Sequence, residues 1–171
     1  ERLGGQIFMS KTGHSHVKNN LKKFNADLAG EMSGHIFFAK DYYGFDDAFF
    51  AAVKVLEILN NNDKKLSDLV DEIPRVFNTP EIRIDCDDNK KFDIISKITE
   101  RQKRSKKQIT NIDGVRVFEK NGWWLLRASN TQPAIVLRCE SLTEDGLEFQ
   151  KRLVKKELSE FNIDIFEKII S

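Results

Sequence analysis

Short apolar runs separated by polar loops mark the first part of the chain. Runs typical of buried strands occupy residues 6–9, 26–29 and 36–39. An amphipathic stretch at 15–25 favours a helix, and Ser15 is placed to cap its start. The pattern predicts a strand, a helix and two further strands joined by polar loops.

A longer helix should follow these strands. Apolar residues recur at helical spacing from Phe49 to Leu59, after Asp46 and Asp47, either of which can begin the helix. The run 60–63, Asn-Asn-Asn-Asp, should end it. A short helix at 66–73 then precedes Pro74.

The second part of the chain shows a different order of elements. Residues 75–80 have the proline and turn residues of a linker, which divides the chain into domains at 1–74 and 81–171. Beyond it, strands are expected at 81–86, 114–118, 123–126 and 134–140, and helices at 90–101 and 143–161. Asn121 and Gly122 form a hairpin signal. The fold class is α/β (α+β), with a partial three-layer α/β domain followed by a two-layer β-α-β-β-β-α domain.

Composition narrows the class of protein. The 171 residues are 40% hydrophobic and 32% charged, as in ordinary globular proteins, and the net charge of +1 gives no general attraction to nucleic acid or membranes. Cys86 and Cys139 lie far apart, which favours reduced core thiols and a cytoplasmic location. No apolar run approaches the roughly 18 residues that span a bilayer, and no signal peptide is evident. The start without Met suggests part of a longer protein.

Five of the seven residues at 101–107 are Lys or Arg. They are open to two interpretations, a nucleic-acid contact or the solvated end of a helix. Because aromatic residues do not interleave with them and the surrounding domain is not basic, the helix end is the better account.

Residues 127–133, Arg-Ala-Ser-Asn-Thr-Gln-Pro, are the most informative polar stretch. They lie between two predicted strands, so the loop should be stiff. Arg127 can grip phosphate oxygens bidentately, while Ser129, Asn130, Thr131 and backbone N–H groups of the turn can donate to the others. The stretch is therefore either a phosphate receptor or an ordinary polar hairpin turn.

A second motif decides between these readings. Residues 30–35 read Gly-Glu-Met-Ser-Gly-His, and together with residues 127–133 they resemble the α-D-phosphohexomutases, specifically the phosphomannomutase/phosphoglucomutase branch. Residues 11–15 and 44–47 look like the family too. The resemblance implies that 1–74 is the C-terminal portion of domain 3 with a sugar loop (residues 30–35). It also implies that 81–171 is domain 4, a TATA-binding-protein-like fold with a phosphate loop (residues 127–133).

The resemblance implies roles for the side chains of the sugar loop. Glu31 and Ser33 would bind adjacent sugar hydroxyls, because an ionised carboxylate accepts two hydrogen bonds and a hydroxyl adds a third. His14 and His35 would line the sugar site and assist proton transfer. From the sequence alone a local hydrogen-bonding role is the better account of each, and the resemblance reverses that preference. His16 should be a solvated helix residue.

The phosphate loop would hold the phosphate group that is not being transferred, through Arg127, Ser129, Asn130 and Thr131. Two further cations stay open in role. Arg138 either supports the loop and contacts phosphate or pairs with Glu140, and Lys11 either pairs with phosphate or stabilises its own loop.

The family's chemistry should lie outside this chain. Such enzymes interconvert hexose 1-phosphates and 6-phosphates of mannose or glucose through a phosphoserine and a bound 1,6-bisphosphate. The chain has neither a phosphoserine loop nor an Asp-x-Asp-x-Asp metal loop, so no catalytic nucleophile and no metal ligand is expected here. Mg²⁺ and glucose 1,6-bisphosphate would belong to the full-length enzyme, and N-terminal domains would be this fragment's partners. The alternative is a stand-alone sugar-phosphate binding or regulatory module.

Overall fold

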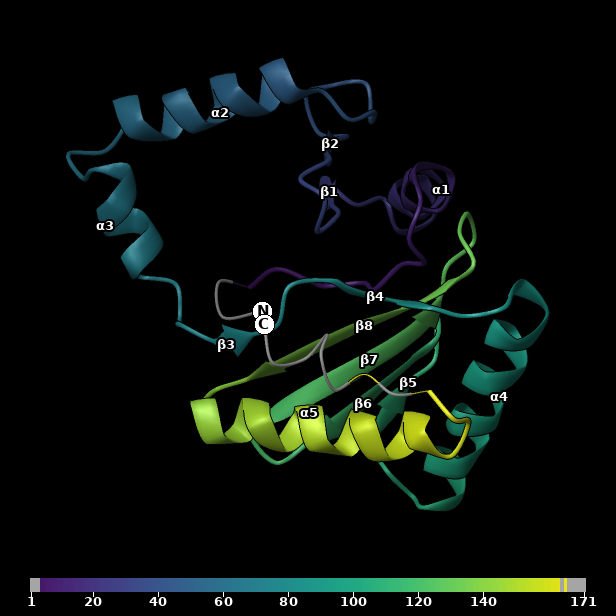
Figure 1. The fold of residues 1–171 in the computed structure, drawn as a ribbon. Coiled ribbons are helices and arrows are strands. Elements are labelled where there is room, and N and C mark those ends of the chain that lie inside the picture. Colours follow the sequence, from purple (N-terminus) through teal and green to yellow (C-terminus); the bar gives the residue numbers. More distant parts are fainter. Residues whose placement is uncertain (1–3, 164, 166–171) are drawn as a thin grey trace. The chain divides into compact units, whose positions relative to one another are not determined.

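The computed structural model describes residues 4–163 and 165 (Figure 1). Its mixture of helices and antiparallel sheets confirms the predicted α/β class. The chain divides into two compact units, Glu1–Pro74 and Arg75–Ser171, called unit 1 and unit 2 below. No helix of the described residues is long and apolar enough to cross a membrane.

Unit 1 is built around a short β-hairpin. Its elements are α1 (His14–Phe24), β1 (Leu28–Gly30), β2 (Ile36–Phe38), α2 (Ala48–Asn60) and α3 (Leu66–Asp71). Strands β1 and β2 pair antiparallel, with Ala29 opposite Phe37, and an isolated bridge joins Phe37 to Asp46. The hairpin and the segment before α2 are therefore tied together at Phe37.

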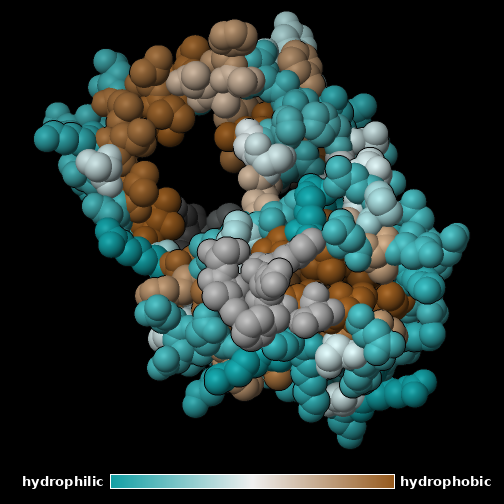
Figure 2. Space-filling model, in the orientation of Figure 1, coloured by the Kyte–Doolittle hydropathy of each residue, from teal (hydrophilic) through white to brown (hydrophobic). Residues whose placement is uncertain are grey.

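The buried core of unit 1 is small. Val17 and Leu21 on α1 pack with Phe37, which is fully buried. Helix α2 buries none of its side chains, and Phe49 is 88% exposed. Figure 2 shows hydrophobic side chains gathered over α2. The helix has an apolar face that the described residues leave uncovered.

Some predictions for unit 1 are wrong. Residues 6–9 form no strand, and three of their side chains, Ile7, Phe8 and Met9, are exposed, because the described residues offer them no neighbouring strand to pair with. Helix α1 begins at His14 after Gly13, so Ser15 lies inside the helix rather than capping it. Asp47, in contrast, is confirmed as the cap of α2, where its carboxylate accepts the backbone N–H of Phe50.

Unit 2 is a helical layer packed on one antiparallel sheet, as predicted (Figure 1). Its elements are β3 (Phe77–Asn78), β4 (Ile82–Asp85), α4 (Asp88–Arg104), β5 (Ile109–Thr110), β6 (Val115–Glu119), β7 (Gly122–Ala128), β8 (Ala134–Ser141) and α5 (Glu144–Ser159). The sheet order is β3-β8-β7-β6-β5, and β4 also pairs with β8. Helix α5 starts close to its predicted position, after the cap Thr143, whose hydroxyl accepts the backbone N–H of Gly146.

Alternation along the strands builds the core of unit 2. Trp124, Leu126 and Ala128 of β7 point to the buried side, and Val115 and Val117 of β6 join them. The cluster also includes side chains of β4, β8, α4 and α5, together with Ile165. Cys139 of β8 is fully buried there, as a free thiol, and burial raises its pKa to about 12.

Several boundaries in unit 2 differ from the prediction. The hairpin loop is Lys120–Asn121 rather than Asn121–Gly122, because Gly122 pairs with Glu119 as the first residue of β7. Asn121 takes the left-handed conformation, with φ 71. A side chain at Gly122 would collide with the Glu140 carbonyl oxygen, so the glycine serves close packing against β8.

Other differences concern elements that the apolar pattern did not reveal. Two-residue strands, β3 and β5, were not predicted, and β3 lies inside the segment 75–80 that was expected to be a linker. Helix α4 runs to Arg104, so most of the basic stretch at 101–107 belongs to the helix. Arg101 there pairs with Glu157 and Glu160, near the end of α5, which supports the helix-end interpretation.

Candidate functional site

The sugar loop forms the tip of the β1–β2 hairpin. The backbone N–H of Glu31 donates to the His35 carbonyl over 2.9 Å, and that of Gly34 donates to the Glu31 carbonyl over 3.0 Å. Gly34 has φ 88, a left-handed conformation that glycine adopts without strain. The turn therefore holds Glu31, Ser33 and His35 on one short, closed loop.

The four predicted sugar-binding residues come together around the Glu31 carboxylate. One oxygen, Oε1, accepts the backbone N–H of Gly13 at 2.8 Å. The other, Oε2, lies 3.6 Å from His14 Nε2 and 3.7 Å from His35 Nδ1. Ser33 Oγ is 2.7 Å from His35 Nδ1. Residues separated by up to 21 positions thus form one polar cluster.

Asp46 joins this cluster and was missed as a site residue. Its Oδ1 lies 3.5 Å from His14 Nδ1. The sequence suggested Asp46 only as a helix start, since its position beside the hairpin depends on the bridge between Asp46 and Phe37, which has no local sequence signal. Ligand atoms of His14, His35 and Asp46 all lie within 4.8 Å of one another, so these residues are arranged as a group that can hold a metal ion.

The next residue, Asp47, has a separate, structural role. The Tyr42 hydroxyl donates to its Oδ2 over 2.5 Å and the Phe50 N–H donates to Oδ1. These two hydrogen bonds lower the pKa of Asp47. The carboxylate therefore stays ionised as the cap of α2, beside the site but not in it.

The turn in the phosphate loop of unit 2 has fewer residues than predicted, because Arg127 and Ala128 belong to strand β7. Arg127 lies on strand β7, opposite Val136, and the loop proper begins at Ser129, whose N–H donates to the Ala134 carbonyl over 2.9 Å. Asn130 and Thr131 are exposed at the tip. The arrangement offers a cation on a strand and polar side chains on the adjoining turn.

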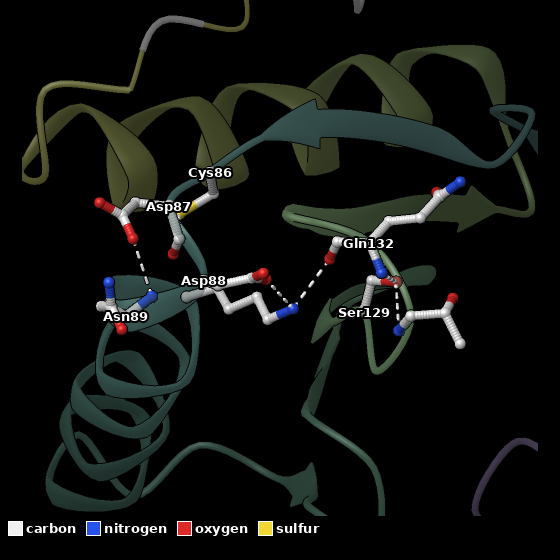
Figure 3. Close-up of polar contacts among 8 residues, drawn as sticks. Cys86, Asp87, Asp88, Asn89, Ser129 and Gln132 are labelled. Atoms are coloured by element: carbon white, nitrogen blue, oxygen red, sulfur yellow. Dashed lines mark hydrogen bonds and ion pairs between the residues drawn. The ribbon is translucent and has the colours of Figure 1, made fainter.

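Ser129 is used to build this loop. It is 3% exposed, and its Oγ accepts the backbone N–H groups of Thr131 at 3.4 Å and Gln132 at 3.2 Å (Figure 3). The prediction that backbone N–H groups of the turn face a ligand therefore does not hold for these two, which point to Ser129. The turn is closed by its own hydroxyl, as in other serine turns.

Lys91 of α4 holds the phosphate loop from outside and was not predicted. Its side chain is 4% exposed, and Nζ donates to the Gln132 carbonyl at 2.8 Å and to Asp88 Oδ1 at 2.5 Å (Figure 3). Lys91 shares the helical spacing of the buried Ile94, Ile95 and Ile98. A lysine on an apolar helix face is the signal that could have identified it, because a buried ammonium needs polar partners.

Further contacts fix the other parts of the loop. Arg83 Nη1 donates to Gln132 Oε1 at 2.6 Å, and the Cys86 N–H donates to the Pro133 carbonyl at 2.9 Å. Strand β4 and the start of α4 therefore support the turn along its C-terminal half.

Arg127 and Arg138, on the two strands that flank the loop, are each paired with an acid. Arg127, 14% exposed in its side chain, has Nε 3.9 Å from Asp113 Oδ2. Gly114 has φ 78, and a side chain there would collide with the Leu126 carbonyl oxygen, so the Asp113 turn packs tightly beside Arg127. Arg138 Nη2 lies 3.9 Å from Glu140 Oε2, which is the pairing named above as its second possible role.

Two further predictions concern exposed residues of unit 1, His16 and Lys11. His16 is exposed on α1, as expected of a solvated helix residue. Lys11 is exposed as well, and its two possible roles stay open.

Comparison with known proteins identifies the class that this fold and these loops define. A model described as "Phosphoglucomutase/phosphomannomutase, alpha/beta/alpha domain III" matches residues 1–77, and one described as "Phosphoglucomutase/phosphomannomutase, C-terminal domain" matches residues 81–155. The chain belongs to the α-D-phosphohexomutase family, and it carries that family's third and C-terminal domains, which confirms the resemblance seen in the sequence.

Individual relatives agree with this assignment. A phosphomannomutase/phosphoglucomutase of Pseudomonas putida is 43% identical over 158 residues, covering 92% of this chain and 34% of that protein. A phosphoglucomutase of Neisseria gonorrhoeae is 40% identical over 85% of this chain and 32% of its own length. The crystal structure of a phosphoglucomutase/phosphomannomutase family protein from Burkholderia thailandensis superposes with a TM-score of 0.82 at 37% identity, covering 92% of this chain and 33% of that one. The chain thus spans about a third of its relatives' length.

Proposed function

We propose that this chain is the substrate-recognition part of a phosphomannomutase/phosphoglucomutase. The complete enzyme would interconvert hexose 1-phosphate and hexose 6-phosphate through a phosphoserine and a bound 1,6-bisphosphate. The observation that carries the proposal is the convergence of His14 and His35 on the Glu31 carboxylate, with Ser33 in contact with His35, in a chain whose relatives are named as such mutases. We also propose that the protein is cytoplasmic, because both of its cysteines are free thiols.

The sugar would be recognised through Glu31 and Ser33. Glu31 Oε1 is already fixed by the Gly13 N–H, which leaves Oε2, the oxygen that faces the two imidazoles, to accept a sugar hydroxyl. His14 and His35, both 45% exposed in their side chains, would donate or accept on either side of it. The carboxylate, the hydroxyl and the imidazoles differ in hydrogen-bonding character, and together they would fix the orientation of the sugar ring.

The phosphate would be held by Arg127, Ser129, Asn130 and Thr131. Arg127 would recognise the charge and the oxygen positions of a phosphate group, which are the same for any sugar. One loop could therefore bind either end of a hexose bisphosphate. The buried Ser129 acts mainly by shaping the turn, while Asn130 and Thr131 at the exposed tip supply donors. The contacts from Lys91 and Arg83 keep this tip in place.

The phosphoryl-transfer chemistry would come from other domains, so the chain alone should be inactive. Mg²⁺ would be needed in the full-length enzyme to neutralise developing charge. Among the described residues, the one cluster of potential metal ligands found has two imidazoles and one carboxylate. Mg²⁺ prefers oxygen ligands, so this cluster does not fit the ion. We accordingly place Mg²⁺, and glucose 1,6-bisphosphate as intermediate, with the full-length protein.

A titration of the isotope-labelled chain with mannose 6-phosphate and glucose 1-phosphate tests the proposal. Backbone amide signals should shift at 31–35 and at 129–132. Arg127→Met should weaken binding about tenfold or more, because a charge-assisted hydrogen bond contributes about 1.5–3 kcal/mol. Arg152→Met, at an exposed position of α5, is the matched control and should bind as the unsubstituted chain does.

Glu31→Gln tests the sugar half in the same way, with the exposed Glu57→Gln of α2 as its control. Loss of binding by Glu31→Gln alone supports the assignment. Unmoved amide signals at both loops, in a chain whose spectrum shows it folded, would remove the proposal.

A further inference from the structure

We propose that His14, His35 and Asp46 form a binding site for Zn²⁺ or a similar borderline divalent cation. The inference goes beyond the proposed function, which requires no metal at this position. It rests on the arrangement of donor atoms in unit 1, with no reference to the sugar.

The spacing of the donors suits a small cation better than direct hydrogen bonding. His14 Nδ1 and Asp46 Oδ1 are 3.5 Å apart, longer than a good hydrogen bond between such groups. Two ligands bound to one tetrahedral Zn²⁺ at about 2.0–2.2 Å lie roughly 3.3–3.6 Å apart. The donor atoms of all three residues lie within 4.8 Å of one another, and the exposed imidazoles can turn to close the remaining gap.

The backbone holds the three donors in place. His14 begins α1, and its ring lies edge-on to the fully buried Phe37, with centroids 5.4 Å apart. His35 ends the closed sugar loop directly before β2. Asp46 is tied to Phe37 by the β-bridge, and its neighbour Asp47 caps α2. The three side chains therefore meet through regular structure and not through a chance contact of loose loops.

Outer groups around the donors match what a zinc site needs. Ser33 Oγ lies 2.7 Å from His35 Nδ1, a contact of the kind that fixes the ring orientation of a metal-binding histidine. Glu31 Oε2 is within 3.7 Å of both imidazoles and adds a second negative charge opposite a divalent ion. Two carboxylates and two neutral imidazoles balance a charge of +2.

The donor types select the class of ion. Two nitrogens and one carboxylate oxygen form a set used by Zn²⁺ sites that keep a fourth position open. Mg²⁺ and Ca²⁺ prefer oxygen ligands throughout and should bind poorly. Co²⁺ has similar ligand preferences and gives visible absorption that reports its coordination, so it serves as the spectroscopic probe.

Calorimetric titration of the whole 171-residue chain with ZnCl₂ tests the site. The background variant is Cys86→Ser, because Cys86 is a partly exposed thiol that can bind zinc by itself. We expect one equivalent to bind, with amide shifts centred on residues 14, 35 and 46. His14→Asn, His35→Asn and Asp46→Asn should each weaken binding about tenfold or more. His16→Asn, two residues from His14 and exposed on α1, should leave the affinity unchanged.

Each outcome decides the matter. Absence of stoichiometric zinc binding, equal loss in His16→Asn, or no loss in the three ligand variants would overturn the site. A saturable response of the same amides to Mg²⁺ would overturn the ion class. If one variant fails to fold, the Co²⁺ spectrum of the other two still reports whether imidazole and carboxylate ligands are bound. Because no sugar phosphate is present, a failure of sugar-phosphate binding would leave this result intact.

Discussion

Units 1 and 2 differ in what holds their polar loops. The core cluster of unit 2 has seventeen buried side chains among the described residues, whereas that of unit 1 has three. The phosphate loop of unit 2 lies at the end of two long strands and is tied from outside by Lys91. The sugar loop of unit 1 lies on two three-residue strands. Unit 2 can hold its site by packing, and unit 1 holds its site mostly through polar contacts.

This difference indicates how each unit should behave in solution. Burial of apolar area drives folding, so unit 2 should be the stable part of the chain. Helix α2, with no buried side chain, gains little from packing within the described residues. We expect α2 to be the least protected helix.

The largest expected effect is a core truncation in unit 2. Leu126→Ala should lower the free energy of unfolding by about 2–5 kcal/mol, because Leu126 is fully buried. Both tryptophans, Trp123 and Trp124, lie on β7, so the unfolding transition followed by fluorescence reports unit 2. Leu21→Ala in unit 1 is the matched variant and should leave that transition in place. An equal shift from Leu21→Ala would show that the units unfold together.

A smaller effect should follow removal of the support beneath the phosphate loop. Lys91→Met removes a charged hydrogen bond from the Gln132 carbonyl, which keeps its bond from the Ala134 N–H, and such a charged bond contributes about 1.5–3 kcal/mol. Amide hydrogen exchange at 129–132 should accelerate, and sugar-phosphate affinity should fall while the fold is retained. The exposed Lys90→Met on the same helix provides the comparison, and identical exchange in both variants would contradict the role of Lys91.

One side-chain helix cap from each unit, Asp47 and Thr143, allows the units to be compared at one kind of contact. Thr143→Ala on α5 should reduce the stability of unit 2 by about 1 kcal/mol, visible in the fluorescence midpoint. Asp47→Ala on α2 removes a similar contact, but the loss should appear as faster amide exchange in α2 with an unchanged midpoint. A midpoint shifted by Asp47→Ala would mean that α2 contributes to the stability of unit 2.

The smallest effect is a pH dependence confined to unit 2. The pKa of Cys139 is about 12 when folded, above the roughly 8.5 of an unfolded thiol, so the unfolded state loses its proton first as pH rises. Stability should be independent of this group below about pH 8 and fall by roughly 0.8 kcal/mol by pH 9. Denaturant midpoints of the unsubstituted chain and Cys139→Ala should converge as pH rises. Parallel curves would exclude the effect.

The parts of the fold that were predicted correctly have strong local signals. The strand on either side of the phosphate loop is marked by an apolar run, and Asp47 precedes an amphipathic run as a cap does. The proximity of Glu31, Ser33 and His35 could also be expected from the sequence, since they lie within five positions.

The missed features depend on tertiary contacts. Residues 6–9 look like a buried strand, but four apolar residues cannot reveal whether a partner strand exists. Strands β3 and β5 have two residues each, too few for any periodicity. Asp46 reaches the site through a bridge to Phe37, and Lys91 reaches the phosphate loop over 41 positions, so neither role is encoded near the residue itself.

The lengths of the strands in unit 2 have a consequence for how the protein behaves when concentrated. Its long strands, β7 with seven residues and β8 with eight, lie inside the sheet, and the outer positions are taken by β5, β3 and β4, which have two, two and four residues. Open backbone donors and acceptors along a sheet edge are where a second molecule adds its own strand. Because the outer strands are short, they offer few backbone hydrogen bonds to a strand of a second molecule. The architecture therefore discourages edge-to-edge aggregation.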